Sequence, residues 1–261
     1  MEGYQVDELK LYFGDDIKIA DGIIIKSPTI GDIVDYGEME YFSMAQTLTA
    51  TPSSMKVALD DMKLDWEKVT DFQLFAMLSQ SLPQSATKLL LGDLDLTTLK
   101  LYSINDSDNV VLSNEDHSII INEIIYDTLM TNIRKMHGFS KQVDKAANAR
   151  THRVLIDLAR QDAKRTQEKP RKSFLLPLIS SLQGRQSYTK DYIRNMGIFE
   201  FMNQINRVQI IVQADAALGG MYSGFVDTKK MDKSILDWTR DLSDENKKSN
   251  HSNKTLQEGA N

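Results

Sequence analysis

Apolar residues at helical spacing dominate this sequence, and strand-like alternation is confined to short runs in its first half. Helical spacing is clear from Ile30 onward, returns between Ile124 and Met136, and governs the long segment from Ile198 to Leu218. No run approaches the roughly 18 consecutive apolar residues that a membrane-spanning helix requires. We therefore predict a mainly helical α+β fold, with small antiparallel β elements in the N-terminal half, a helical C-terminal half and no membrane span.

Short alternating runs bounded by glycine, asparagine and aspartate predict the β elements. A first group, which predicts two or three antiparallel strands, lies at residues 8–13, 17–19 and 23–26. A second group, which predicts a three-stranded meander, lies at residues 94–104, 110–112 and 119–121.

Several helix boundaries are predicted by residues that satisfy the unpaired backbone groups at helix ends. Thr29 with Asp32 has the spacing of a capping box, and Thr70 has the chemistry of a second N-cap. Glycine after a helical run favours a helix end, since it tolerates the left-handed conformation found there. Such glycines are Gly92, Gly138 and the pair Gly219-Gly220, and Gly37 predicts a bend. A basic helix is predicted over residues 149–169, ending before Pro170, and a last helix over residues 228–242.

Charge divides the chain into unlike parts. Residues 1–133 hold 8 Lys and Arg against 23 Asp and Glu, whereas residues 134–172 hold 12 against 4. With the helical pattern, this predicts an acidic α+β domain at residues 1–138, a basic linker and helix at 139–172, a helical domain at 173–242, and a flexible polar tail at 243–261. A dipolar chain of this kind attracts copies of itself as well as charged partners, so we expect self-association.

The basic segment is the main candidate for binding a charged partner. The residues predicted to do so are Arg150, Arg153, Arg160, Lys164, Arg165, Lys169, Arg171 and Lys172. Clustered cations bind nucleic acid by releasing counterions from phosphates, but the segment has almost no aromatic residues for stacking on bases. Docking against an acidic surface, including the acidic part of this chain, and a simply solvated face are the competing interpretations.

Signatures of catalysis are missing from the sequence. It has neither of the glycine-rich phosphate-binding patterns and no nucleophile elbow, and the absence of cysteine excludes disulfides, thiolate metal sites and cysteine nucleophiles. The four histidines, His117, His137, His152 and His251, share no metal-binding spacing. The acidic pairs Asp15/Asp16, Asp60/Asp61 and Asp93/Asp95 are more simply surface residues than catalytic carboxylates. We therefore expect no catalytic, cofactor-binding or metal-binding residues, and a protein that is not an enzyme.

The chain resembles the tail assembly chaperones of tailed phages and prophages of Gram-positive bacteria, which are encoded beside the tape measure protein. The segments that carry the resemblance are residues 23–33, 37–41, 92–96, 134–138 and 221–227, followed by Lys230, Met231 and Trp238. None of these segments is a chemical motif, so no client-binding residues can be transferred from the family.

The resemblance implies a protein of the host cytoplasm that covers the tape measure protein until tail tube subunits assemble around it. A helical scaffold with apolar grooves and self-complementary charge is compatible with this role. Two alternatives remain open: a structural component of the virion, such as a connector or baseplate subunit, and a nucleic-acid-binding protein that uses residues 134–172.

Overall fold

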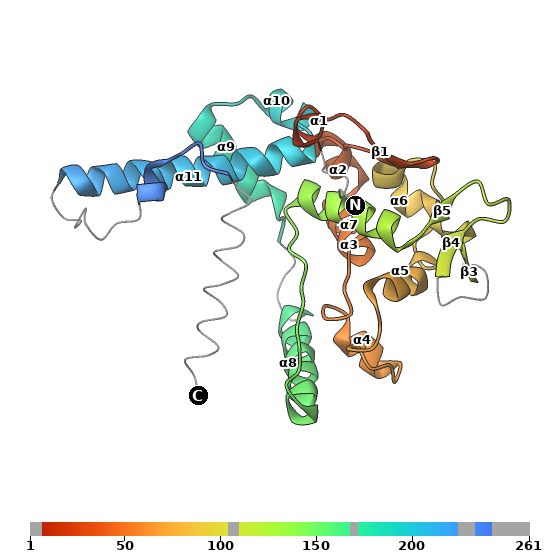
Figure 1. Cartoon of the computed structure of the whole chain (residues 1–261). Coiled ribbons are helices and arrows are strands. Elements are labelled where there is room, and N and C mark those ends of the chain that lie inside the picture. Colours follow the sequence, from red (N-terminus) through yellow and green to blue (C-terminus); the bar gives the residue numbers. More distant parts are fainter. Residues whose placement is uncertain (1–6, 104–109, 168–171, 224–232, 242–261) are drawn as a thin grey trace.

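The computed structural model describes residues 7–103, 110–167, 172–223 and 233–241 (Figure 1). It confirms the predicted fold class, because two small antiparallel sheets lie in the N-terminal half and helices make up the C-terminal half. The elements are α1 (Glu8–Tyr12), β1 (Ile17–Ala20), β2 (Ile23–Ile25), α2 (Ile30–Tyr36), α3 (Glu38–Leu48), α4 (Lys56–Asp61), α5 (Asp71–Ser79), α6 (Gln84–Leu91), η1 (Leu96–Thr98), β3 (Lys100–Ser103), β4 (Val110–Ser113), β5 (Ile120–Ile121), α7 (Glu123–His137), α8 (Ala149–Gln167), α9 (Leu175–Gln186), α10 (Lys190–Asn195), α11 (Ile198–Tyr222) and η2 (Lys233–Leu236).

Both predicted groups of strands are present. In the first group one of the predicted strands is a helix, and in the second group the first strand is shorter than predicted. Strands β1 and β2 form a hairpin, and β3, β4 and β5 form the predicted meander. The run at residues 8–13 is not a strand, because the Asp7 side chain accepts hydrogen bonds from the Leu9 and Lys10 amides and starts α1. The run from residue 94 becomes a strand only at Lys100, since Asp95 caps the short helix η1. Ile104 lies outside the described residues.

The helix caps predicted at Thr29, Thr70, Gly92 and Gly138 are confirmed. Thr29 forms a capping box with Asp32 at the start of α2, and Thr70 forms one with Gln73 at the start of α5. Gly92 and Gly138 end α6 and α7 with positive φ angles of 61° and 67°. Between α2 and α3, Gly37 has a φ of 109°, so the predicted bend separates two helices.

Two predictions about the C-terminal helices are wrong. Helix α11 does not break at Gly219-Gly220 but continues to Tyr222, because an interior glycine weakens a helix by only about 1 kcal/mol and does not force it to end. The described part of the last predicted helix, residues 233–241, is a 3-10 turn followed by irregular chain. Arg207 of α11 holds the irregular chain after that turn by donating hydrogen bonds to the carbonyl oxygens of Trp238 and Arg240. The predicted polar tail lies outside the described residues.

One large core joins most of the molecule. It takes in buried side chains from Leu11 in α1 to Ile205 in α11, and it includes residues of α9 and α10 as well as both sheets. It therefore contains residues from the predicted segments 1–138 and 173–242. The division of the chain into those segments stays a prediction.

A second, smaller core attaches α8 to the rest of the protein. Leu59 of α4, Trp66, Leu74 of α5 and Ile156 of α8 form this cluster. Figure 1 shows α8 projecting from the main body beside α4, while α11 extends to the opposite side from the three-stranded sheet. Within the described ranges, no helix combines the length and the apolar character needed to cross a membrane.

Candidate functional site

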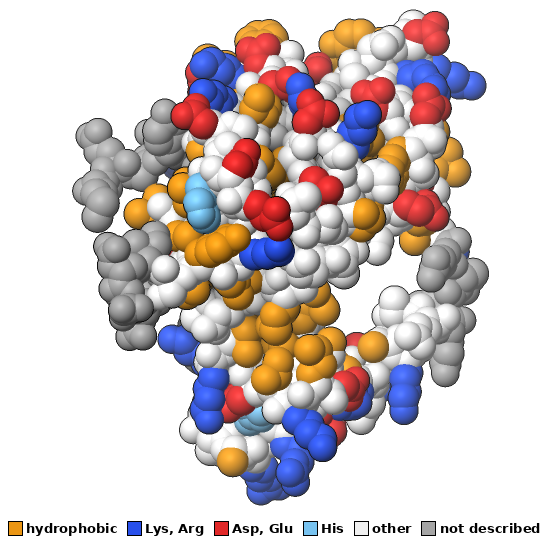
Figure 2. All heavy atoms as spheres, turned by 90° about the vertical axis from the view of Figure 1, so that its right-hand side faces the viewer, with side chains coloured by type: hydrophobic (Ala, Val, Ile, Leu, Met, Phe, Trp, Pro, Cys, Tyr) orange, Lys and Arg blue, Asp and Glu red, His pale blue; other side chains and the backbone are white. Residues whose placement is uncertain are grey.

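Helix α8 carries most of the predicted binding residues and has little contact with the rest of the protein. Of its 19 residues, only Ile156 is buried. Val154 and Leu158 on the same helix are 45% and 51% exposed. Figure 2 shows Lys and Arg side chains gathered at the lower end of the molecule, where α8 lies. The helix thus presents a largely free surface of mixed basic and apolar character.

One predicted cation, Arg160, contacts the acidic part of this same chain. Its guanidinium is 2.6 Å from Asp60 Oδ2 and 2.5 Å from Asp61 Oδ1, and both carboxylates are at the end of α4. These two hydrogen bonds stabilise the charged guanidinium and raise the pKa of Arg160 above its ordinary value. The acidic pair Asp60/Asp61 therefore docks α8 in this structure.

The other predicted cations are placed differently. Arg165 is 3.7 Å from Asp162 on its own helix. No ion pair forms between Arg150, Arg153 or Lys164 and any residue that the structure describes. Lys172 lines a separate depression with Phe42 and Phe174, and Lys169 and Arg171 lie outside the described residues. The structure thus groups Arg150, Arg153 and Lys164 on one helix, and their role in binding stays a prediction.

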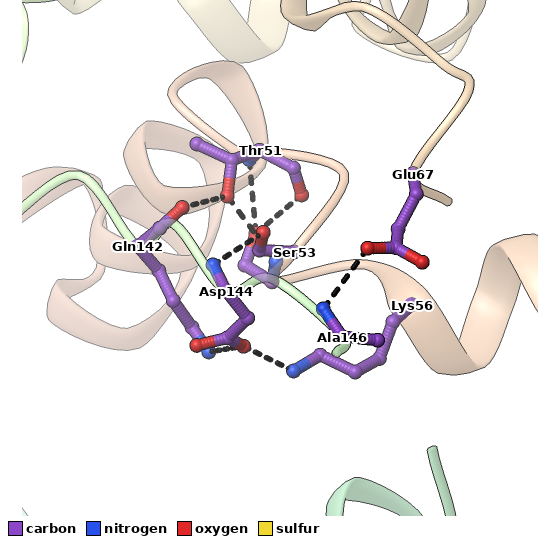
Figure 3. Close-up of polar contacts among 8 residues, drawn as sticks. Thr51, Ser53, Lys56, Glu67, Gln142, Asp144 and Ala146 are labelled. Atoms are coloured by element: carbon purple, nitrogen blue, oxygen red, sulfur yellow. Dashed lines mark hydrogen bonds and ion pairs between the residues drawn. The ribbon is translucent and has the colours of Figure 1, made fainter. Parts of the chain in front are cut away.

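Residues 139–148, predicted as a linker, have no regular secondary structure, but they are held against the start of α4 (Figure 3). Thr51 Oγ1 donates a hydrogen bond to the Gln142 carbonyl at 2.8 Å, and Ser53 Oγ accepts one from the Asp144 amide at 2.9 Å. Lys56, which is 5% exposed, forms an ion pair with the Asp144 carboxylate. These contacts give residues 139–148 a defined path along the protein. The polar composition of the segment does not predict that path.

Another contact between α8 and the chain that follows α4 brings together Asp65, Glu67 and His152. His152 Nε2 is 3.2 Å from Asp65 Oδ1 and 4.0 Å from Glu67 Oε2. The imidazole stacks on the Trp66 indole, with ring centroids 5.3 Å apart and an interplanar angle of 14°. The group opens into a depression of about 1070 Å³ that Arg150 and Arg153 also line. Sequence spacing misses this group, because the carboxylates and the histidine come from distant parts of the chain.

The remaining described histidines have structural roles. His137, the last residue of α7, bonds to the Ile133 carbonyl through Nδ1 at 2.7 Å. Its Nε2 is 2.7 Å from the Tyr41 hydroxyl, and complete burial lowers its pKa to about 4. His117 Nδ1 is 2.9 Å from Ser113 Oγ. That serine is only 1% exposed and its hydroxyl also donates to the Ile119 carbonyl, so the serine hydroxyl is not accessible to a substrate.

In each of the other two acidic pairs, one carboxylate makes a contact at the surface. Asp16 forms an ion pair with Lys26 at 2.6 Å, and Asp95 accepts a hydrogen bond from the Thr97 amide at 3.0 Å. These contacts are ordinary surface interactions.

An apolar groove lies between α9 and α11. Its volume is about 390 Å³ and it is lined by Leu178, Ser181, Leu182, Ile205, Val208, Gln209, Val212 and Gln213. The lining residues are uncharged, and Val212 is 44% exposed. The groove has the composition expected of a site for an apolar helix face.

Comparison with known proteins gives one match. Residues 167–243, which include α9, α10, α11 and η2, match the model of the YomV second domain, a family of phage and prophage origin. No curated protein and no solved structure matches the chain. The match covers less than half of the chain, and it supports a phage origin for this protein.

Proposed function

We propose that this chain is a phage protein without catalytic activity, and that it works as a tail assembly chaperone that binds the tape measure protein through α8. The observation that carries the proposal is that a 19-residue amphipathic helix has a single buried residue. In proteins most helical stability comes from packing the apolar face of the helix against other elements, and α8 has little such packing. A partner that covers the exposed face of α8 would supply the missing packing.

The chemistry of α8 favours an acidic helical segment as the client. Arg150, Arg153 and Lys164 provide positive charge, while Val154 and Leu158 provide exposed apolar surface. An amphipathic client helix with acidic and apolar positions would match both properties. The phage origin and the resemblance to tail assembly chaperones make the tape measure protein the first client to test.

Co-expression with the tape measure protein of the same phage tests the proposal. We expect this chain to keep the client in the soluble fraction and to co-purify with it. The triple variant Arg150→Gln, Arg153→Gln and Lys164→Gln is expected to weaken the complex about tenfold or more, because three interfacial charges are lost. The matched control changes three exposed cations on other elements, Lys10→Gln, Lys63→Gln and Lys190→Gln, and should bind like the unmodified chain.

An equal loss of binding affinity in both triple variants would show that only the net charge of the chain matters. A chain that binds no tail protein at all would contradict the proposal. Nucleic acid is the competing partner for the same cations. If it is the true partner, affinity falls steeply with added salt and the tape measure protein does not compete. A structural role in the virion would instead be indicated by a fixed number of copies in purified particles.

A further inference from the structure

The group formed by Asp65, Glu67 and His152 is unlike an ordinary surface ion pair. It contains three potential metal-ligand atoms that lie within 4.8 Å of one another. Two carboxylates come from the chain that follows α4, and the imidazole comes from the first turns of α8. The side chains are 39%, 36% and 25% exposed, so an ion can reach them from solvent.

The distances within the group approach those of a metal site. Zinc binds histidine nitrogen and carboxylate oxygen at roughly 2.0–2.2 Å in a tetrahedral arrangement, which places the ligand atoms roughly 3.3–3.5 Å apart. The observed separations from His152 Nε2, 3.2 Å to Asp65 and 4.0 Å to Glu67, lie on either side of that value. Small rotations of two partly exposed carboxylates would complete the geometry.

The surroundings hold the ligand side chains in place. The indole of Trp66, which is 3% exposed, fixes the plane of the His152 ring by stacking. Glu67 Oε1 accepts a hydrogen bond from the Ala146 amide at 3.0 Å, which leaves Oε2 directed to the group. Asp65 Oδ1 accepts one from the Glu67 amide at 3.1 Å. Such outer contacts orient ligands in known metal sites.

We propose that Asp65, Glu67 and His152 bind one divalent transition metal ion, with Zn²⁺ as the ion that suits one nitrogen and two oxygen ligands. Lys68 Nζ, 3.5 Å from Asp65 Oδ2 and 83% exposed, moves into solvent when the ion binds. The imidazole proton shifts to Nδ1, so that the Nε2 lone pair faces the metal. The coordination position that remains is open to water or to a carboxylate of a bound protein.

The ion would connect two elements that otherwise meet through a small contact area. Bound metal links α8 to the segment after α4, beside the contacts of Arg160 with Asp60 and Asp61. Arg150 and Arg153 line the same depression and reduce its attraction for a cation, so we expect weaker binding than at a site without these two charges. The inference does not depend on the proposed chaperone function.

Zinc titration of the metal-stripped full chain tests this inference. We expect one Zn²⁺ per chain by calorimetry, a rise in melting temperature with zinc, and a change in Trp66 fluorescence in a Trp238→Phe background. His152→Gln and Glu67→Gln are each expected to weaken binding at least tenfold and to remove the fluorescence change. Far-UV circular dichroism of each variant checks that the fold is intact.

Control variants separate this group from exposed metal-binding groups in general. His117→Asn and Glu115→Gln alter a histidine and a carboxylate on the three-stranded sheet and its turn, and should leave zinc affinity unchanged. The inference is overturned if folded His152→Gln binds zinc as tightly as the unmodified chain. Loss of zinc binding in His117→Asn would overturn it equally, because the ion would then bind elsewhere.

Discussion

Replacing Phe201 with alanine is expected to lower the free energy of unfolding by about 3–5 kcal/mol. Phe201 is 0% exposed and belongs to the core that joins α11 to the elements of the N-terminal half. Removing its ring loses the transfer free energy of an aromatic side chain and leaves a cavity among side chains that cannot fully close it. Urea unfolding followed by circular dichroism measures the loss.

The matched control lies on the same helix. Tyr222 is 88% exposed, so Tyr222→Ala should change stability by about 0.5 kcal/mol or less. Trp66, in the smaller core, provides a second probe when Trp238 is replaced by phenylalanine. We expect Phe201→Ala to shift the Trp66 transition together with the circular dichroism. A shift confined to circular dichroism would contradict one cooperative core and would favour independent domains.

Stability is expected to fall by about 2 kcal/mol between pH 7.5 and pH 5 because of His137 alone. Burial lowers the pKa of this histidine from its usual 6.5 to about 4, although the hydrogen bond to the Ile133 carbonyl acts in the opposite direction. The unfolded chain therefore takes up a proton on His137 below pH 6.5, while the folded chain stays neutral until about pH 4. The stability that neutral His137 contributes is fully present above pH 6.5 and is lost as the pH falls from 6.5 to about 4.

The neutral form fits the surroundings of His137. Nδ1 donates to the Ile133 carbonyl, so Nε2 can accept a hydrogen bond from the Tyr41 hydroxyl, and burial raises the pKa of that hydroxyl. Urea unfolding at several pH values measures the effect. His137→Gln should be less stable at pH 7.5 but should have a flatter pH dependence than the unmodified chain. Equal slopes in His137→Gln and the unmodified chain would refute the assignment.

Local chemistry explains which parts of the fold could be predicted. The caps at Thr29 and Thr70 bond to backbone amides only three residues away, so their partners are fixed by sequence. The ends of α6 and α7 follow from glycine conformation at Gly92 and Gly138. The wrong predictions arose where two local signals competed. At residues 8–13 the alternation of apolar and polar residues predicts a strand, but Asp7 caps a short helix there. The pair Gly219-Gly220 permits a helix end without requiring one.

The candidate site could be predicted only in part. The basic character of α8 is visible in the sequence, but its acidic partner Asp60 is 100 residues from Arg160. The group of Asp65, Glu67 and His152, and the ion pair of Lys56 with Asp144, likewise join distant segments. No periodicity or spacing rule identifies such partners, since they meet only when the smaller core packs.

The amino-acid sequence is sufficient to predict the helical and strand periodicities, most helix caps, the charge asymmetry and the absence of thiol chemistry. These properties depend on residues within a turn or two of each other, or on composition alone. The packing of α8 on α4 through Ile156 and Trp66 depends on the tertiary structure. That packing in turn sets which charged side chains form ion pairs and which face solvent. The reason is physical: apolar burial is not directional, so the surface on which a helix packs is set by the shape and charge of the folded surroundings.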